Sequence, residues 1–203
     1  PQGESLELPT LALADIIAAE WAGQGEHIVL PDMPATRLAH TAIDAVGPTR
    51  EAVAAEVATY AASDLLCYFA DGPKALVERQ VSHWGPVLAW AERDLNLHLK
   101  RTTGIIHQPQ APETLDLVRA LALRLDDFAL AGLAYGAGLF GSAVLALAVE
   151  RGELTGEAAF DLSRLDEAFQ EEQWGVDYEA AARTARMRAE AGMLDGWFAA
   201  LKG

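Results

Sequence analysis

The stretch FALAGLAYGAGLFGSAVLALAV, residues 128–149, decides the fold, because none of its 22 side chains is charged. A segment of this length could cross the ~30 Å core of a bilayer, and Gly132 with Gly136 forms the GxxxG spacing of packed membrane helices. However, four glycines interrupt it, Ser142 is a natural helix N-cap, and the charges on its two flanks show no positive-inside asymmetry. The sequence therefore predicts two buried helices joined by a glycine turn, with a membrane hairpin as the alternative.

Upstream of this segment, a loop from Gly104 to Pro112 separates a mixed half of the chain from a helical half. Before the loop, alternating or β-branched runs predict strands at 5–8, 27–30 and 97–103, among helices that break at Gly47-Pro48 and Gly85-Pro86. The apolar run at 64–69 predicts a buried strand, with a helix end as the alternative. After the loop, the apolar residues follow helical spacing throughout. The sequence predicts the α+β class, mainly α overall. A small N-terminal mixed α/β module over residues 1–108 is followed by an all-α helical domain over 109–203.

The chain of 203 residues is acidic, since 15 Lys and Arg oppose 30 Asp and Glu for a formal net charge of −15. A hydrophobic content of 51% excludes a disordered acidic tail. The charge argues against nucleic acid and anionic membrane surfaces as partners. The single cysteine excludes an intramolecular disulfide, and the first residues lack the features of a signal peptide. We therefore expect a soluble protein of a reducing compartment.

Motifs of enzymes are weak in this sequence. Residues 136–141 read GAGLFG and match the GxGxxG of dinucleotide-binding folds, but no strand is predicted before them. The five histidines are not spaced as metal ligands, and no HExxH occurs. Cys67 lies in the apolar run Leu65 to Phe69, which predicts a buried, inert thiol. We expect no cofactor and no bound metal.

Large aromatic side chains mark expected core positions in the N-terminal half. Trp21, Trp84 and Trp90 all lie in predicted helices. Burial of a large ring stabilises a fold by a few kcal/mol. We therefore expect all three to be core anchors.

The acidic charge is concentrated between Glu150 and Glu179, where ten acids face only Arg151 and Arg164, for a local balance of −8. Such a run is typical of a solvated helix face. It is also typical of a docking surface for a basic partner, because complementary fields steer encounters and select partners.

Within the acidic run, residues 165–175 read LDEAFQEEQWG. On a helix, Glu167, Gln170, Glu171 and Trp174 share one face, whereas Leu165 and Phe169 point toward another. Asp177 and Glu179 continue the acidic character. The face predicts a binding surface, and the alternative is a solvated face with Trp174 tucked into the core.

Several stretches, in chain order, resemble one known family. They are LPT (8–10), AEW (19–21), TRLAHTAID (36–44), DLLCY (64–68), LVERQ (76–80), GSAVLALA (141–148) and the cluster at 165–175. The sequence is similar to the assembly chaperones that attend the α subunit of the ATP synthase catalytic head, the ATP-twelve family. Members begin with further strand-forming residues ahead of Leu6, so the resemblance implies that the N-terminal module lacks its first strands.

The resemblance implies a non-enzymatic chaperone, monomeric and without cofactor, that binds the free α subunit and prevents its aggregation until it pairs with β. It implies no nucleic-acid partner and no stable membrane insertion. It also implies a cytoplasmic location in a bacterium or the mitochondrial matrix in a eukaryote. The docking site it implies comprises Glu167, Gln170, Glu171, Trp174, Asp177 and Glu179.

An alternative function is a small enzyme that uses Glu167 and Glu171 as acid and base. A catalytic pair should line a concave pocket and have shifted pKa values, whereas a docking pair should lie on an open surface. The structure can therefore separate the two interpretations.

Overall fold

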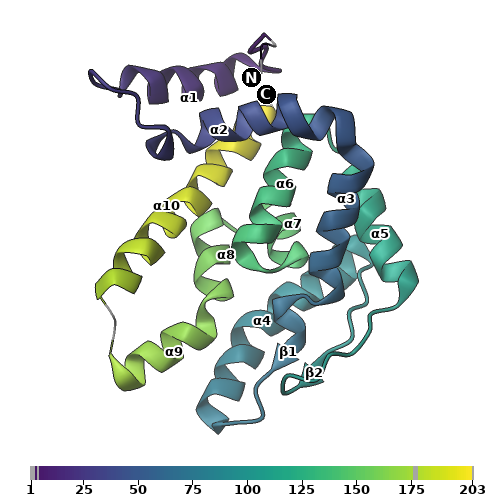
Figure 1. The fold of residues 1–203 in the computed structure, drawn as a ribbon. Coiled ribbons are helices and arrows are strands. Elements are labelled where there is room, and N and C mark those ends of the chain that lie inside the picture. Colours follow the sequence, from purple (N-terminus) through teal and green to yellow (C-terminus); the bar gives the residue numbers. More distant parts are fainter. Residues whose placement is uncertain (1–2, 4, 176–177, 203) are drawn as a thin grey trace.

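The structure is a computed structural model that describes residues 3, 5–175 and 178–202. In these residues, α-helices form most of the fold and one pair of short strands accompanies them (Figure 1). The helices are α1 (Leu11–Ala22), α2 (Pro34–Thr41), α3 (Gly47–Ala62), α4 (Lys74–Leu95), α5 (Pro112–Leu123), α6 (Asp127–Phe140), α7 (Ala143–Arg151), α8 (Gly156–Ser163), α9 (Leu165–Trp174) and α10 (Tyr178–Leu201). The strands are β1 (Tyr68–Phe69) and β2 (Thr102–Thr103). The predicted class, mainly α with a small β element, is confirmed.

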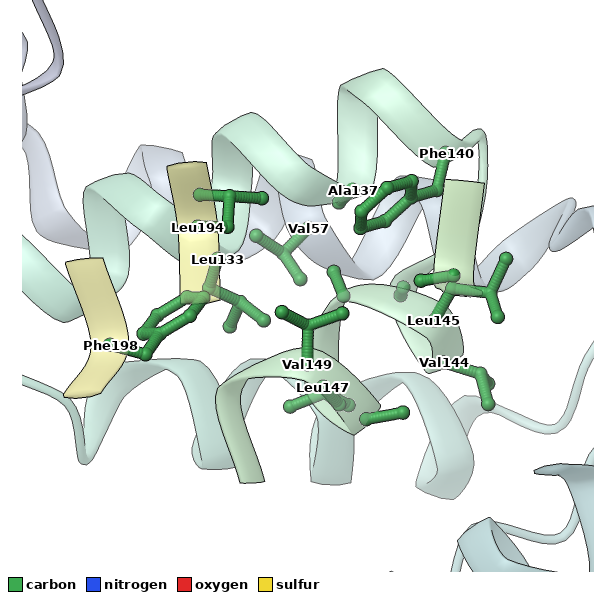
Figure 2. Close-up of a cluster of buried hydrophobic side chains, with 14 of the residues drawn as sticks. Val57, Leu133, Ala137, Phe140, Val144, Leu145, Leu147, Val149, Leu194 and Phe198 are labelled. Atoms are coloured by element: carbon green, nitrogen blue, oxygen red, sulfur yellow. The ribbon is translucent and has the colours of Figure 1, made fainter. Parts of the chain in front are cut away.

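The charge-free segment forms the buried hairpin that the sequence predicts. Helix α6 ends at Gly141, whose φ of 62° is the left-handed conformation that glycine adopts freely. Ser142 then caps α7, since its hydroxyl oxygen accepts a hydrogen bond from the Leu145 N–H at 3.0 Å. Figure 2 shows side chains of α6, α7 and α10 interdigitating in this core. Among the helices of the described residues, none combines the length and the apolarity that crossing a membrane requires.

The GxxxG spacing serves close packing within this core. A Cβ on Gly132 would lie 2.8 Å from the indole nitrogen of Trp197 in α10, so only glycine fits beneath that ring. The same indole nitrogen donates a hydrogen bond to the Phe128 carbonyl at 3.0 Å. A buried tryptophan thereby fixes α10 against α6.

The strands are shorter and fewer than predicted. β1 and β2 pair in parallel, with Tyr68 opposite Thr102, so only the last two residues of the runs 64–69 and 97–103 are strand. Residues 5–8 are irregular, and Leu30 opens a short 3₁₀ turn, Leu30–Asp32. The predictions at 5–8 and 27–30 are wrong, because an alternating or β-branched run becomes strand only where a partner strand accepts its hydrogen bonds.

The structure also differs from the sequence prediction at both expected helix breaks. Helix α4 continues through Gly85 and Pro86 over 22 residues, and Trp84 and Trp90 on it are buried as expected. At Gly47-Pro48 the chain instead passes from α2 through a π-helical turn, Ala42–Val46, into α3, with non-helical backbone at Thr49. Trp21 is 42% exposed, so its prediction as a core anchor is wrong.

The hydrophobic core is one connected cluster that runs from Leu13 in α1 to Ala200 in α10. Helix α3 packs on α5 and α6, which brings residues from both sides of position 108 together. At the ends of the chain, the Thr10 hydroxyl donates to the Ala200 carbonyl at 2.8 Å and joins α1 to α10. The division into modules at 108 stays a prediction.

Candidate functional site

Helix α9 carries the predicted docking residues and lies at one end of the molecule, against α4 and α8 (Figure 1). Its inner face provides Leu165, which is buried, and Phe169, which is half-buried on the core. The guanidinium carbon of Arg79 lies 5.2 Å from the centre of the Phe169 ring, in a cation–π contact. The apolar side of α9 therefore seats the helix on α4.

Two polar contacts complete this seat. Arg79 donates to both carboxylate oxygens of Glu172, at 2.7 and 2.9 Å. The buried Gln80 donates to Asp166 at 2.8 Å and accepts from the Ala70 N–H at 2.8 Å, which links α9 to the end of β1. Burial raises the pKa of Asp166, and the bond from Gln80 opposes that rise. These contacts fix the orientation of α9.

The outer face of α9 presents three of the predicted residues to solvent. Glu167, Gln170 and Trp174 are exposed, and Trp174 is 80% exposed. Glu171 is half-buried and lies 3.4 Å from an Arg164 nitrogen, and a second nitrogen of that guanidinium lies 3.7 Å from Glu167. The prediction that these residues share a face is confirmed, and the alternative of a core Trp174 is wrong.

Two further predicted residues cannot be placed on this face. Asp177 lies outside the described residues, and so does the side chain of Glu179, whose backbone belongs to the first turn of α10. Their part in a docking site stays a prediction.

A cavity opens on the other side of α9. It has a volume of about 570 Å³ between α4, α8 and α9 and is lined by Arg79, His83, Ala158, Asp161, Leu162, Leu165 and Ala168. Glu167 and Glu171 do not line it. The pair lies on an open helix face beside Arg164, which is the geometry expected of a docking surface rather than of a catalytic pair.

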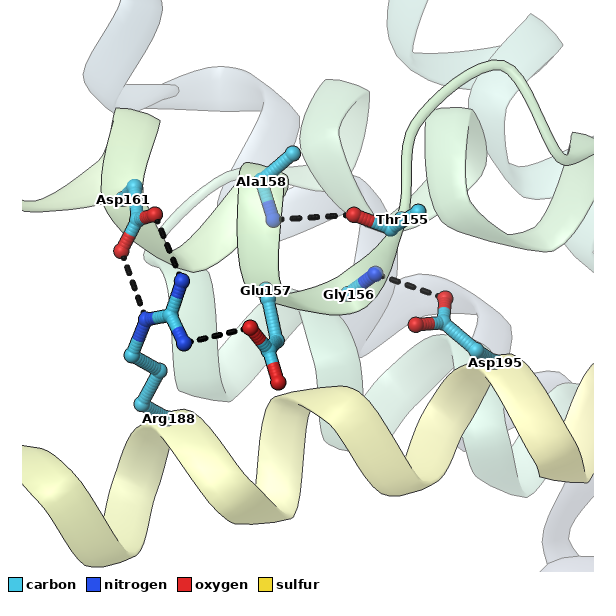
Figure 3. A network of polar contacts seen from close by, with 7 residues as sticks. All are labelled: Thr155, Gly156, Glu157, Ala158, Asp161, Arg188 and Asp195. Carbon is cyan, nitrogen blue, oxygen red and sulfur yellow. Dashed lines mark hydrogen bonds and ion pairs between the residues drawn. The ribbon is translucent and has the colours of Figure 1, made fainter.

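The acidic run is partly neutralised by a base from α10 (Figure 3). Arg188 donates to both oxygens of Asp161 at 3.0 Å and also to Glu157, so it joins α10 to α8. Nearby, Asp195 accepts the Gly156 N–H at 2.7 Å and so caps the start of α8. When Arg79 and Arg188, which pair with acids of this run, are counted with residues 150–179, the local net charge changes from −8 to −6.

Sequence reasoning missed the residues that position the face: Arg79, Gln80, Asp166 and Glu172. A signal was present, because the stretches at 76–80 and 165–175 both belong to the resemblance and are in contact here.

Two other pairs of stretches from the resemblance are also in contact. Glu20 accepts from Thr36 N at 2.7 Å and Thr36 Oγ1 at 2.6 Å, and Asp64 accepts from Ser142 Oγ at 2.7 Å and Val144 N at 3.0 Å.

Comparison with known proteins gives concordant results. The family model described as ATP12 chaperone protein matches residues 1–92. Atp12 from Paracoccus denitrificans, whose crystal structure is known, is 42% identical in sequence to this chain. The match covers 99% of this chain and 86% of the Paracoccus chain, and the two structures superimpose with a TM-score of 0.92. A point mutant of that protein gives the same values. The protein Atu1473 from Agrobacterium tumefaciens is 38% identical over 98% of this chain and 74% of its own, with a TM-score of 0.91.

Proposed function

The chain belongs to the ATP12 chaperone family, and we propose that it assists ATP synthase assembly by binding the free α subunit of the catalytic head. Binding would cover the surface of that subunit until the β subunit pairs with it. An unassembled subunit exposes apolar and charged surface meant for its neighbours, and such surface aggregates. A protein that covers it needs a complementary face and no catalytic centre.

The observation that carries this proposal is the exposed Trp174 beside Glu167 and Gln170 on a helix that α4 holds in place. Tryptophan is enriched among the residues that dominate binding energy, because burying its ring removes a large apolar area from water. The acids beside it would select a basic partner surface and speed its approach. Asp177 and Glu179 extend the same site in our proposal.

We propose that the protein acts without chemical turnover, as a monomer and without a cofactor. The position of Glu167 and Glu171 on an open face supports this, since a general acid–base pair works in a pocket that excludes water. As a chaperone of this family, it would act in the bacterial cytoplasm or the mitochondrial matrix, where the α subunit is assembled.

The experiment is a titration of purified α and β subunits, separately, into the full chain, followed by calorimetry. We expect α to bind and β not to bind. Glu167→Lys and Trp174→Ala should each weaken α binding by about tenfold or more, as hot-spot residues do, with unchanged circular dichroism. Asp116→Lys, an exposed acid on α5, is the control with the same charge change as Glu167→Lys. Failure of wild-type protein to bind α would overturn the function, and full binding by both α9 variants would overturn the site.

A further inference from the structure

A groove remote from the outer face of α9 runs across α2, the π-helical turn, α3, α6 and α10. It consists of two adjoining cavities of about 350 and 430 Å³. Both are lined by Arg37, Glu56, Ala134 and Tyr135. The first cavity has a mainly apolar floor that includes Leu38, Val46, Val53 and Ala131.

Local backbone features open this groove. The π-helical turn Ala42–Val46 carries an extra residue, and its Ala45 and Val46 line the first cavity. Such turns recur at functional sites. On the facing side of α6, Gly138 leaves room for Tyr60, because a Cβ there would lie 3.3 Å from the Tyr60 hydroxyl. The α6 residues that line the two cavities include the small residues Ala131, Ala134 and Gly138.

The polar groups of the groove leave one carboxylate unused. The Tyr135 hydroxyl donates to Glu190 at 2.6 Å, and Arg37 lies 3.7 Å from the other Glu190 oxygen. Burial, followed by the bond to Glu190, raises the pKa of Tyr135, so the phenol stays a neutral donor. Within the described part of the chain, no hydrogen bond or ion pair reaches the carboxylate of Glu56, which is exposed and borders both cavities.

We propose that this groove binds a short segment of the partner polypeptide in which an aliphatic side chain adjoins a lysine or arginine. The aliphatic group would enter the cavity floored by Leu38, Val53 and Ala131, and the cation would pair with Glu56. Charge complementarity selects this occupant, because Glu56 and Glu190 together outweigh Arg37 and repel an acidic segment.

The identity of the partner rests on the proposed function, in which it is the α subunit. Helix α10 connects the two regions, since it extends from beside the end of α9 to α2 and contributes Met187 and Glu190 to the groove (Figure 1). One extended partner could therefore contact α9 and the groove together. Two separated contacts on one partner multiply in affinity without further contact area.

The direct test is an NMR titration of the full chain with two synthetic ten-residue peptides. One alternates leucine and lysine, and the other alternates leucine and glutamate. We expect only the lysine peptide to shift the amide signals of Ala134 and Tyr135. Glu56→Lys should weaken it about fivefold, because the reversed charge replaces attraction by repulsion at an exposed position, whereas Asp116→Lys should not. Ala134→Leu, which fills the floor, should also weaken it. Shifts that map elsewhere, or equal binding by Glu56→Lys and Asp116→Lys, would overturn the proposal.

A second arm separates failure of the groove from failure of the proposed function. Capture of the α subunit is compared between wild type, Glu56→Lys and Asp116→Lys. We expect weaker capture by Glu56→Lys alone. Equal capture by all three would overturn the role of the groove in α binding and leave the α9 proposal standing. If wild type captures no α subunit, the proposed function fails, and the peptide titration still decides whether the groove binds a basic apolar segment.

Discussion

The carboxylate of Asp64 shows how a single buried residue can fix two elements. It is fully buried and accepts hydrogen bonds from the Leu66 N–H, the Ser142 hydroxyl and the Val144 N–H. It thereby caps a second short 3₁₀ turn, Leu65–Cys67, just before β1, and it also ties that turn to the start of α7. Burial raises its pKa to about 6, although the three bonds act in the opposite direction. Desolvation is therefore the stronger effect at this site.

The raised pKa of Asp64 gives a stability change with a definite sign. As pH falls from 7 to 4, the folded protein takes up this proton before the unfolded chain does, so protonation favours folding. Compared with Asp64→Asn, which does not titrate, wild type should gain up to about 3 kcal/mol in free energy of unfolding across this window. Urea denaturation of both proteins at several pH values measures the gain. A gain as pH rises would show that the hydrogen bonds outweigh burial.

Cys67 provides a reporter of local opening. Its side chain is 1% exposed, and burial raises the pKa of the thiol to about 12. Because the thiolate is the reactive form, we expect no labelling by a thiol reagent near pH 8 in the folded protein and rapid labelling in guanidinium chloride. The chain has a single cysteine, so the signal is unambiguous. Rapid labelling without denaturant would contradict the burial.

At the scale of elements, α8 and α10 approach each other more closely than side chains allow. A Cβ on Gly156 would lie 1.8 Å from the Ala191 carbonyl oxygen, whereas a Cβ on Gly192 across the same contact would meet Glu157 at an ordinary 3.4 Å. Gly156→Ala should therefore lower the free energy of unfolding by about 3 kcal/mol or more. Gly192→Ala should leave it unchanged or raise it by up to about 1 kcal/mol, through helix propensity. Thermal and urea unfolding of the pair test the contact, and similar losses in both would refute it.

The contacts that hold α9 on α4 give a second prediction at this scale. Arg79→Glu places like charges at the contact with Glu172, so α9 should loosen and its amides should exchange faster with deuterium. Binding of the α subunit should fall by up to about fivefold, although Arg79 is not on the contact face. The double variant Arg79→Glu/Glu172→Arg should recover most of both properties. Unchanged exchange in the single variant would show that other contacts hold α9.

Helices could be predicted from the sequence better than strands, for a physical reason. The N-cap Ser142 and the glycine turn before it act locally, and both appear where they were expected. A strand depends on a partner that local sequence does not specify, so the runs at 5–8 and 27–30 gave no strand. The prediction of Trp21 as a core anchor is wrong for a related reason. Helix α1 is apolar on most of its surface, but only Leu13 and Ile17 on it are buried, so the local sequence does not show which face is covered.

The candidate site was partly predictable. Helical spacing placed Glu167, Gln170 and Trp174 on one face, and the structure decides that Trp174 on it is exposed. The residues that orient this face were not predictable, because Arg79 and Glu172 are 93 positions apart and meet only in the folded chain. The groove escaped prediction for the same reason, since Glu56, Ala134 and Glu190 come from three separate helices.

For the whole molecule, the question is whether partner binding depends on the net charge of −15 or on the acids of α9. Arg79 pairs with Glu172 and Arg188 with Asp161, whereas Glu167 and Glu171 on the outer face of α9 share the single Arg164, so that face keeps a net negative charge. Exposed charges act over about 10 Å at 0.1 M salt. A patch on α9 should therefore influence an arriving partner, whereas acids on α5 should act weakly.

Surface plasmon resonance with the α subunit at about 0.05 and 0.5 M NaCl separates the two cases. Wild type should lose roughly tenfold in affinity, mainly through slower association, as steered complexes do. Glu167→Lys and Asp116→Lys change the net charge equally, but only Glu167→Lys should flatten the salt dependence. Trp174→Ala should instead speed dissociation at both salt concentrations, because the ring acts by apolar burial. Equal salt slopes for the two lysine variants would assign the steering to net charge and remove the electrostatic role of α9.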